Sequence, residues 1–216
     1  MMVPVVVLPD PAAAARAAGA VVAWQVRGAV AARGHASLAV SGGSSPAAMF
    51  AELARLGVPW AAVSVLQVDE RFAPDGDPER NLTTQRAELP AEARIHPMPV
   101  DDGDPGPYVS LVAELDVVHL GLGEDGHTAS LVPHDPVLEV MDVDVAVTGV
   151  YRGHRRMTLT YPALDRARAI VWLVTGEGKA AVLPRLLAAD PSIPAGRVAQ
   201  DRALVVADTA AAAELP

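Results

Sequence analysis

The chain contains 216 residues, no cysteine and a formal net charge of -9. The excess of acidic side chains argues against nucleic acid or an acidic membrane surface as a partner, since either one needs a basic binding surface. The lack of cysteine excludes disulfides, thiolate metal sites and a cysteine nucleophile.

Hydrophobic periodicity and turn residues predict elements that alternate along the chain. In chain order we expect the strand 3–8, the helix 11–33, the strand 38–40, the helix 46–56, the strand 63–68, a loop at 73–78, the helix 81–89, a loop at 101–107, the strands 117–120, 143–150, 157–160 and 169–174, the helix 179–188 and the strand 203–206. This alternation favours an α/β fold with a single doubly wound, mostly parallel sheet and helices on both faces. The length suits one such core, so we expect one domain over residues 1–216.

Membrane insertion and secretion are not expected from this sequence. No apolar run reaches the roughly 20 residues that span a bilayer. The apolar run at the N-terminus lacks the basic residues of a secretion signal and is interrupted by Pro4, Pro9 and Pro11. We therefore expect a soluble, cytoplasmic protein. A small anionic substrate is compatible with the acidic net charge, because it responds to local cations.

Three of the predicted strands end in turn glycines or charged side chains. These strand ends are the segments 41–45, 69–71 and 121–128. The carboxyl ends of parallel strands lie along one edge of a sheet, where open α/β folds bind their ligands. The three segments are therefore expected to converge and to form the active site.

His127 is the strongest candidate for acid–base chemistry. It is one of six histidines and the only one in a glycine-rich turn that follows a strand and contains an acid, Asp125. A neutral imidazole takes a proton from water near pH 7, and Asp125 or another carboxylate would orient it. Asp69, Glu70 and Arg71 form either a solvated ion cluster or part of the site, and their position after a buried strand favours the site.

Two features predict an anion site. The segment 41–45 places hydroxyls and backbone N–H groups before a predicted helix, although an ordinary capped turn has the same pattern. Lys179 is the only lysine and follows a strand through a glycine-rich turn, where a compact ammonium suits a phosphate. No metal is expected, because the histidines lack the spacing of a metal site. A serine hydrolase is not expected either, because the chain has no Gly-x-Ser-x-Gly segment. Gly121, Gly123 and Gly126 match the dinucleotide spacing, but the charged residues beside Gly126 make nicotinamide binding a minor alternative.

Five segments occur in the order and approximate spacing of a known family, namely 41–46, 69–71, 121–131, 156–160 and 178–179. In these segments the chain resembles the 6-phosphogluconolactonases of the sugar-phosphate isomerase/deaminase superfamily. The resemblance implies a doubly wound α/β fold and no cofactor. It also implies hydrolysis of the phosphosugar lactone 6-phospho-D-glucono-1,5-lactone to 6-phospho-D-gluconate in the oxidative pentose phosphate pathway.

The resemblance implies roles for individual residues. His127 would be the general base that activates water, and Asp69 and Arg71 would lie near the reacting end of the sugar. Asp125 and Glu70 would lie behind these residues. The phosphate of the substrate would be held by Ser44, Arg156 and Lys179 together with the backbone of Gly42 and Gly43.

Two positions separate the chain from its relatives. Arg80 stands where the family commonly has serine, and it either alters loop contacts or adds a cation at the rim of the site. The related glucosamine-6-phosphate deaminases and phosphosugar isomerases carry a glutamate five residues after the histidine, where this chain has Val132, which cannot transfer a proton. Lactone hydrolysis is therefore favoured over deamination, and the intact candidate residues disfavour a non-catalytic phosphosugar-binding module. We expect a monomer or at most a weak dimer.

Overall fold

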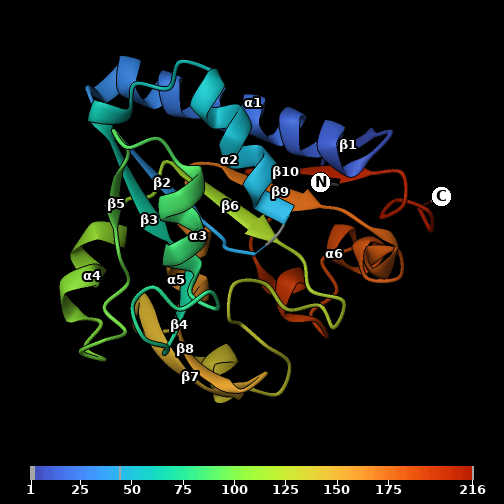
Figure 1. The fold of residues 1–216 in the computed structure, drawn as a ribbon. Coiled ribbons are helices and arrows are strands. Elements are labelled where there is room, and N and C mark those ends of the chain that lie inside the picture. The colour runs from blue at the N-terminus through green and yellow to red at the C-terminus, as the bar shows by residue number, and fades with distance from the viewer. Residues whose placement is uncertain (1–2, 44, 216) are drawn as a thin grey trace.

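The centre of the structure is a seven-stranded sheet in which all neighbouring strands are parallel (Figure 1). The computed structural model describes residues 3–43 and 45–215. The strand order across the sheet is β1-β10-β9-β6-β2-β3-β5. The strands are β1 (Val5–Leu8), β2 (Ala36–Val40), β3 (Val63–Gln67), β5 (Arg94–His96), β6 (Val117–Gly121), β9 (Ile170–Val174) and β10 (Ala203–Asp208). The prediction of a doubly wound, mostly parallel α/β sheet is confirmed.

The order of the strands reverses between β2 and β6. The chain adds β3 and β5 on one side of β2, and it then adds β6, β9 and β10 on the other side. The connections therefore leave the carboxyl ends of β2 and β6 in opposite directions, which opens a crevice at that edge. The three segments that were expected to converge follow β2, β3 and β6.

Helices cover both faces of the sheet (Figure 1). The helices are α1 (Pro11–Arg33), α2 (Ser45–Arg55), α3 (Asn81–Glu88), α4 (Gly106–Val112), α5 (Tyr161–Asp165) and α6 (Leu183–Leu187). One hydrophobic core joins the sheet to α1 and α2, and a second joins it to α4, α5 and α6. In β2, Leu38 and Val40 contribute to the first core and Ala39 to the second, because successive side chains of a strand point to opposite faces.

The long helix α1 has the ends that the sequence predicts. The Asp10 carboxylate accepts a hydrogen bond from the backbone N–H of Ala13 at 2.7 Å, and Pro11 occupies the first turn. Gly34 ends the helix with a φ of 79°, and its N–H donates to the carbonyl of Val30. Within the described ranges, no helix is both long enough and apolar enough to cross a membrane.

A second, antiparallel sheet lies below the main one in Figure 1. Its strands, in order, are β4 (Asp69–Arg71), β8 (His154–Leu159) and β7 (Val145–Tyr151). The sequence predicts two of these strands but not their separate sheet, and it treats 69–71 as the charged end of the preceding strand. The strands β7 and β8 are joined by Arg152 and Gly153, whose φ values of 48° and 87° fit a tight type I′ hairpin turn. Such a turn matches the strand twist and fixes the register of the hairpin tip.

Several predicted boundaries are wrong. The helix expected at 179–188 is a 3-10 turn that ends at Lys179 and a separate helix that begins at Leu183, because Pro184 is tolerated only in a first turn. The loop expected at 101–107 ends early, since α4 begins at Gly106. The sequence does not predict β5, because three residues are too few for a periodic pattern. The 3-10 helices are η1 (Trp60–Ala62), η2 (Pro136–Glu139), η3 (Glu177–Lys179) and η4 (Pro194–Arg197).

Two glycines of α1 are expected to respond in opposite ways to substitution. A Cβ at Gly19 would lie 3.1 Å from the Cβ of Glu52 and 3.2 Å from the carbonyl oxygen of Met49, where α1 packs on α2. Gly19→Val should therefore lower the free energy of unfolding by about 1–3 kcal/mol. Apart from the adjacent residues and the backbone of its own helix, no described atom lies within 4 Å of a Cβ at Gly28. Gly28→Ala should therefore raise that free energy by about 0.5–1 kcal/mol. Urea unfolding measures both changes, and a stabilised Gly19→Val variant would contradict the close packing of α1 on α2.

Candidate active site

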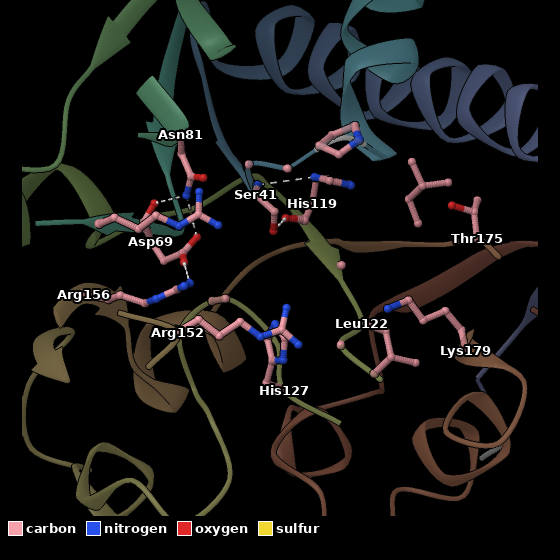
Figure 2. Close-up of a pocket in the computed structure, with 18 residues that line it drawn as sticks. Ser41, Asp69, Asn81, His119, Leu122, His127, Arg152, Arg156, Thr175 and Lys179 are labelled. Carbon is pink, nitrogen blue, oxygen red and sulfur yellow. Dashed lines mark hydrogen bonds and ion pairs between the residues drawn. The ribbon is translucent and has the colours of Figure 1, made fainter. Parts of the chain in front are cut away.

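A cavity of about 300 Å³ lies at the crevice beyond β2 and β6 (Figure 2). Its wall is formed by the loops after β2 and β6, by β4 and β8, and by the segment after β9. In Figure 2, Asp69 and Arg156 lie at one end, Thr175 and Lys179 lie at the other, and His127 lies between them. The segments that were expected to converge therefore do surround one cavity.

The cavity is positively charged although the protein is acidic. The described residues that line it include four cations, Arg71, Arg152, Arg156 and Lys179, and one carboxylate, Asp69. The chain as a whole carries a charge of -9. Cations gathered in a cleft with low-dielectric walls attract an anion more strongly than the same charges on an open surface. The cavity therefore suits a small anionic ligand.

The three charged side chains of β4 point alternately to opposite faces of the strand. Asp69 and Arg71 line the cavity, whereas Glu70 is fully buried on the other side. The Glu70 carboxylate accepts hydrogen bonds from the backbone N–H groups of Asn81 and Leu82, both at 2.8 Å. These N–H groups begin α3 and have no partner within their own helix. Glu70 therefore caps α3 and ties β4 to it, which is a position behind the site as expected.

Two arginines face the cavity from neighbouring strands. Arg71 of β4 lies directly opposite Arg156 of β8 in the antiparallel pairing. Like charges in that position destabilise a strand pair. Asp69 offsets part of the repulsion, since its Oδ2 lies 4.0 Å from Nη1 of Arg156. Burial lowers the pKa of Arg156, and the charge of Asp69 opposes this effect.

The Asp69 carboxylate is held by hydrogen bonds from two other segments. Oδ2 accepts from the hydroxyl of Ser130 at 2.6 Å, and Oδ1 accepts from Nδ2 of Asn81 at 3.1 Å. The same Asn81 nitrogen donates to the carbonyl of Asp69 at 2.9 Å. A Cβ at Gly42 would come within 2.0 Å of Oδ1 of Asn81. The first glycine of the loop after β2 is therefore required by the close approach of Asn81.

Arg80 is not one of the residues that line the cavity. Its side chain is buried, and Nη1 donates to the carboxylate of Asp101 at 2.9 Å and to the carbonyl of Ala73 at 3.3 Å. Its Nε lies 3.8 Å from the carboxylate of Glu70. The expectation that Arg80 adds a cation at the rim of the site is therefore wrong, because its guanidinium is buried against Ala73 and Asp101.

His127 and Asp125 form a hydrogen-bonded pair in the loop after β6. Nδ1 of His127 lies 2.5 Å from Oδ1 of Asp125, and the backbone N–H of His127 donates to the same oxygen at 3.2 Å. A carboxylate only accepts, so Nδ1 carries the proton and Nε2 is an acceptor in the neutral ring. Burial acts to raise the pKa of Asp125, but hydrogen bonds from His127 and Tyr151 and the charge of His127 outweigh burial and lower that pKa.

The glycines around this pair are required by packing. A Cβ at Gly123 would come within 2.0 Å of Nδ1 of His127 and 2.7 Å of Oδ1 of Asp125. Gly126 has a φ of 83°, and a Cβ there would lie 2.6 Å from the Cβ of Ile193. Both glycines let the loop fold tightly around the imidazole and the carboxylate.

Of the side chains expected to bind phosphate, Lys179 lies at the other end of the cavity, whereas Arg156 lies at the Asp69 end (Figure 2). Lys179 ends η3, and its Nζ lies 4.0 Å from Oε1 of Glu124. Gly42 and Gly43 line the same cavity, and Gly43 has a φ of 103°, a conformation that favours glycine. Ser44 lies outside the described residues. Lys179 therefore supplies an ammonium at this end of the cavity, whereas Gly42 borders the cavity beside Asn81.

His119 lines the cavity from inside β6. Its Nδ1 accepts a hydrogen bond from the backbone N–H of Ser41 at 3.4 Å, and the Ser41 hydroxyl donates to the carbonyl of His119 at 3.1 Å. Burial lowers the pKa of His119 to about 3, so the ring is neutral and Nε2 carries the proton. That nitrogen has no hydrogen-bond partner in the described part of the chain. His119 therefore joins the β2 and β6 strand ends as a neutral side chain.

Residues 9–207 match the family model described as glucosamine-6-phosphate isomerases/6-phosphogluconolactonase. The chain belongs to this family. A 6-phosphogluconolactonase of Synechocystis sp. is 37% identical over 193 residues, which cover 79% of this chain and 80% of the relative. The resemblance expected from the five sequence segments is thereby confirmed.

Solved structures of the family have the same fold. A 6-phosphogluconolactonase of Shewanella baltica is 27% identical and has a TM-score of 0.84, with 96% of this chain and 99% of that chain covered. A monomeric glucosamine-6-phosphate deaminase is 16% identical and has a TM-score of 0.85, with 98% of this chain and 99% of that chain covered. The fold alone therefore does not separate the two enzyme classes of the family.

Some residues of the site are not identified by sequence motifs. Ser130 lies in the motif 121–131, but its hydrogen bond to Asp69 joins segments that are far apart in the chain. Tyr151 and Arg152 come from the hairpin tip. The turn residues at 152–153 are the sequence signal that could have identified this hairpin. No group of three or more acidic or histidine side chains among the described residues is arranged to hold a metal ion.

Replacing His119 should change how stability depends on pH. Histidine in an unfolded chain titrates near about 6.5, whereas folded His119 has a pKa of about 3, so the unfolded state binds more protons between these values. His119 therefore lowers the free energy of unfolding as the pH falls below about 6.5, by up to about 1.4 kcal/mol per pH unit. His119→Gln should make the dependence shallower between about pH 6 and pH 4.

Urea unfolding at several pH values measures this slope. His35→Gln is the control for loss of a histidine, since His35 is exposed. Equal slopes in the wild type and His119→Gln would contradict a buried, neutral His119.

Proposed function

We propose that this protein hydrolyses 6-phospho-D-glucono-1,5-lactone to 6-phospho-D-gluconate, with His127 as the general base. The observation that carries the proposal is the hydrogen-bonded His127–Asp125 pair beside a cationic cavity. The substrate class is supported by relatives named 6-phosphogluconolactonase. A phosphosugar lactone combines an anion for the cations to attract with an ester carbonyl that water can attack.

The phosphate would bind toward Gly42, Gly43 and Lys179. Backbone N–H groups before a helix and a compact ammonium are both suited to phosphate. The lactone would then lie toward His127, where Arg156 is also found. The resemblance implies a phosphate contact for Arg156, but its place opposite Arg71 and near Asp69 favours contact with the lactone end of the sugar.

The reaction would transfer an acyl group to water. Nε2 of His127 takes a proton as the water oxygen forms a bond to the lactone carbonyl carbon. Negative charge develops on the carbonyl oxygen, where Arg71 and Arg156 would stabilise it. The bond between this carbon and the ring oxygen then breaks, and the ring oxygen receives the proton from His127. The products are a carboxylic acid, which ionises, and a free hydroxyl, so no covalent enzyme intermediate is required.

Asp69 would act beside the reacting carbonyl without taking the proton from water. Its carboxylate is already held by Ser130 and Asn81 and lies near Arg156. In this arrangement it orients the guanidinium of Arg156, and a free lone pair can accept a hydrogen bond from a sugar hydroxyl. Asp69 therefore serves substrate orientation in the proposed mechanism.

Deamination of glucosamine 6-phosphate is disfavoured by Val132. This residue stands five positions after His127, where the deaminases have a glutamate, and its side chain is 3% exposed. Valine cannot transfer the proton that ring opening and isomerisation require. A non-catalytic binding module is disfavoured by the His127–Asp125 pair, because sugar binding alone does not require a base oriented by a carboxylate.

Substitution of His127 should lower the rate of the chemical step. With the lactone generated in situ, the wild type should hydrolyse it faster than the uncatalysed background reaction. His127→Gln should lower kcat by about 10²–10⁴-fold with little change in KM. His35→Gln should retain wild-type activity, since His35 is exposed and is not one of the residues that line the cavity. Ammonia release from glucosamine 6-phosphate should be absent.

These assays separate the function from the role of His127. Lactone loss at the background rate with the wild type would contradict the proposed function. Full activity of His127→Gln would contradict the role of this histidine and leave the reaction standing.

Removal of the ammonium at Lys179 should weaken binding of the phosphate group. Lys179→Met should raise KM for the phosphorylated lactone by about 10–100-fold, as expected for loss of a charge-assisted hydrogen bond. Hydrolysis of unphosphorylated glucono-1,5-lactone should change little in the same variant. Arg185→Met is the matched control, because Arg185 is a cation that pairs with Asp190 outside the cavity. An equal loss on both lactones would show that Lys179 does not act through the phosphate.

A further inference from the structure

Tyr151 has no part in the mechanism described so far, yet it contacts the base and its carboxylate. Its hydroxyl donates a hydrogen bond to Oδ2 of Asp125 at 2.9 Å, while Oδ1 of Asp125 lies 2.5 Å from Nδ1 of His127. The hydroxyl oxygen also lies 3.5 Å from that Nδ1. The two oxygens of one carboxylate are thus shared between a phenol and an imidazole.

The ring of Tyr151 makes a second set of contacts. It meets the imidazole of His127 edge to face, with ring centroids 5.5 Å apart and an angle of 64° between the planes. The guanidinium carbons of Arg152 and Arg156 each lie 5.2 Å from the centre of the same ring. Both distances are within the range of cation–π attraction. One aromatic side chain therefore contacts the base and two of the four cations of the cavity.

We propose that Tyr151 is a positioning residue, which holds the Asp125–His127 pair in its reactive orientation and tautomer and keeps Arg152 and Arg156 in place at the cavity. This inference rests on the proposed lactone hydrolysis and names a residue that the family motifs leave out. Tyr151 itself does not touch the reacting atoms in this role.

The hydroxyl is needed because, among the described residues, Tyr151 alone donates a side-chain hydrogen bond to Oδ2 of Asp125. The side chain of Asp125 is 35% exposed, and only Oδ1 is held by His127. The hydrogen bond from Tyr151 fixes the second oxygen and thereby the plane of the carboxylate. A carboxylate fixed in this plane keeps the proton on Nδ1 of His127, so that Nε2 remains an acceptor. Loss of the hydroxyl would release the carboxylate and allow the other tautomer.

The hairpin turn supplies the rigidity that such a role requires. Tyr151 is the last residue of β7 and pairs directly with His154 across the two-residue turn. Arg152 occupies the turn with a φ of 48°, a strained conformation for a residue with a side chain. Nη2 of Arg156 lies 3.5 Å from the carbonyl of Tyr151 and donates to it. The small sheet therefore presents the phenol and both guanidinium groups from one short, fixed element.

The charged and titratable groups that face Tyr151 act on the protonation states of its phenol and of the Asp125 carboxylate. These groups are Asp125 and His127 from the loop after β6, and Arg152, His154 and Arg156 from the hairpin. Burial, followed by the hydrogen bond to Asp125 and its charge, raises the pKa of Tyr151, so the phenol stays a donor. The same hydrogen bond contributes to the lowered pKa of Asp125, so this group stays a carboxylate.

Two variants separate the hydroxyl from the ring. Tyr151→Phe should lower kcat for the lactone about tenfold and change KM less than about twofold, as expected for loss of one hydrogen bond to a charged group. The step of the kcat/KM profile at which Asp125 takes up a proton should move to higher pH, because Asp125 loses a hydrogen bond that lowers its pKa. Tyr151→Leu removes the ring as well, so KM should also rise as the two arginines lose their support.

The chain contains a matched control for these substitutions. Tyr161 also donates its hydroxyl to one acceptor, the carbonyl of Pro194 at 3.0 Å, and also stacks against one guanidinium, that of Arg197 at 4.8 Å. It does not line the cavity. Tyr161→Phe should therefore leave the pH profile and kcat unchanged, even if stability falls. Equal shifts of the profile in Tyr161→Phe and Tyr151→Phe would overturn the proposal.

A measurement without substrate separates this inference from the proposed function. Nitrogen NMR of the His127 ring, assigned with His127→Gln, should show the Nδ1–H tautomer in the wild type and a mixture of tautomers in Tyr151→Phe. An unchanged tautomer together with an unchanged kcat would overturn the role of Tyr151. Failure of the wild type to hydrolyse the lactone would contradict the proposed function, and the NMR comparison would still decide whether Tyr151 positions His127.

Discussion

The pairing of β2 with β6 is the constraint on which the site depends. The register sets Val40 beside His119, and the two strands end at Val40 and Gly121. Beyond this pair the chain leaves in opposite directions, so the crossovers leave the crevice between these two ends open. The hydrogen bonds between Ser41 and His119 join the two strand ends below the crevice. The loop that carries the phosphate-binding candidates and the loop that carries His127 are thereby held at a fixed separation, although about eighty residues lie between them in the chain.

The small sheet adds to this crevice the cations that the parallel strands do not supply. Its attachment depends on Glu70, whose buried carboxylate receives N–H groups from the start of α3 and a hydrogen bond from Gln67 at the end of β3. The alternation of a strand then turns Asp69 and Arg71 toward the cavity. A buried carboxylate with several hydrogen bonds is expensive to disturb, because each N–H group would lose its acceptor inside the protein. The acidic residue behind the site thus determines where the basic residues in front of it point.

The sequence predicts the parts of this architecture that depend on local chemistry. Asp10, Pro11 and Gly34 mark the ends of α1, and the glycine-rich turn after β6 identifies His127, because caps and turns act over a few residues. The contacts that join distant segments cannot be predicted in this way. Whether Arg80 would reach the cavity or turn into the protein depends on Asp101 and Ala73, which the motifs do not connect to it. Tyr151 meets Asp125 only because a hairpin brings a distant strand end over the loop, and no periodicity within either segment reports such a contact.

Two arginines of the cavity wall are arranged in a way that costs stability. Arg71 and Arg156 stand opposite each other on neighbouring strands, and the Nε atom of each is buried without a hydrogen-bond partner among the described residues. Like-charge pairing and buried unpaired donors both lower stability. Buried unpaired donors also occur outside the cavity, as at Nε of Arg80, but the opposed pair of like charges lies in the cavity wall. Violations of local rules that concentrate at one site are typical of functional surfaces, where the groups are arranged for a ligand and not for the fold. The stacking of Tyr151 on Arg156 compensates part of this cost within the protein itself, because a polarisable ring face stabilises a guanidinium that carboxylates alone do not neutralise.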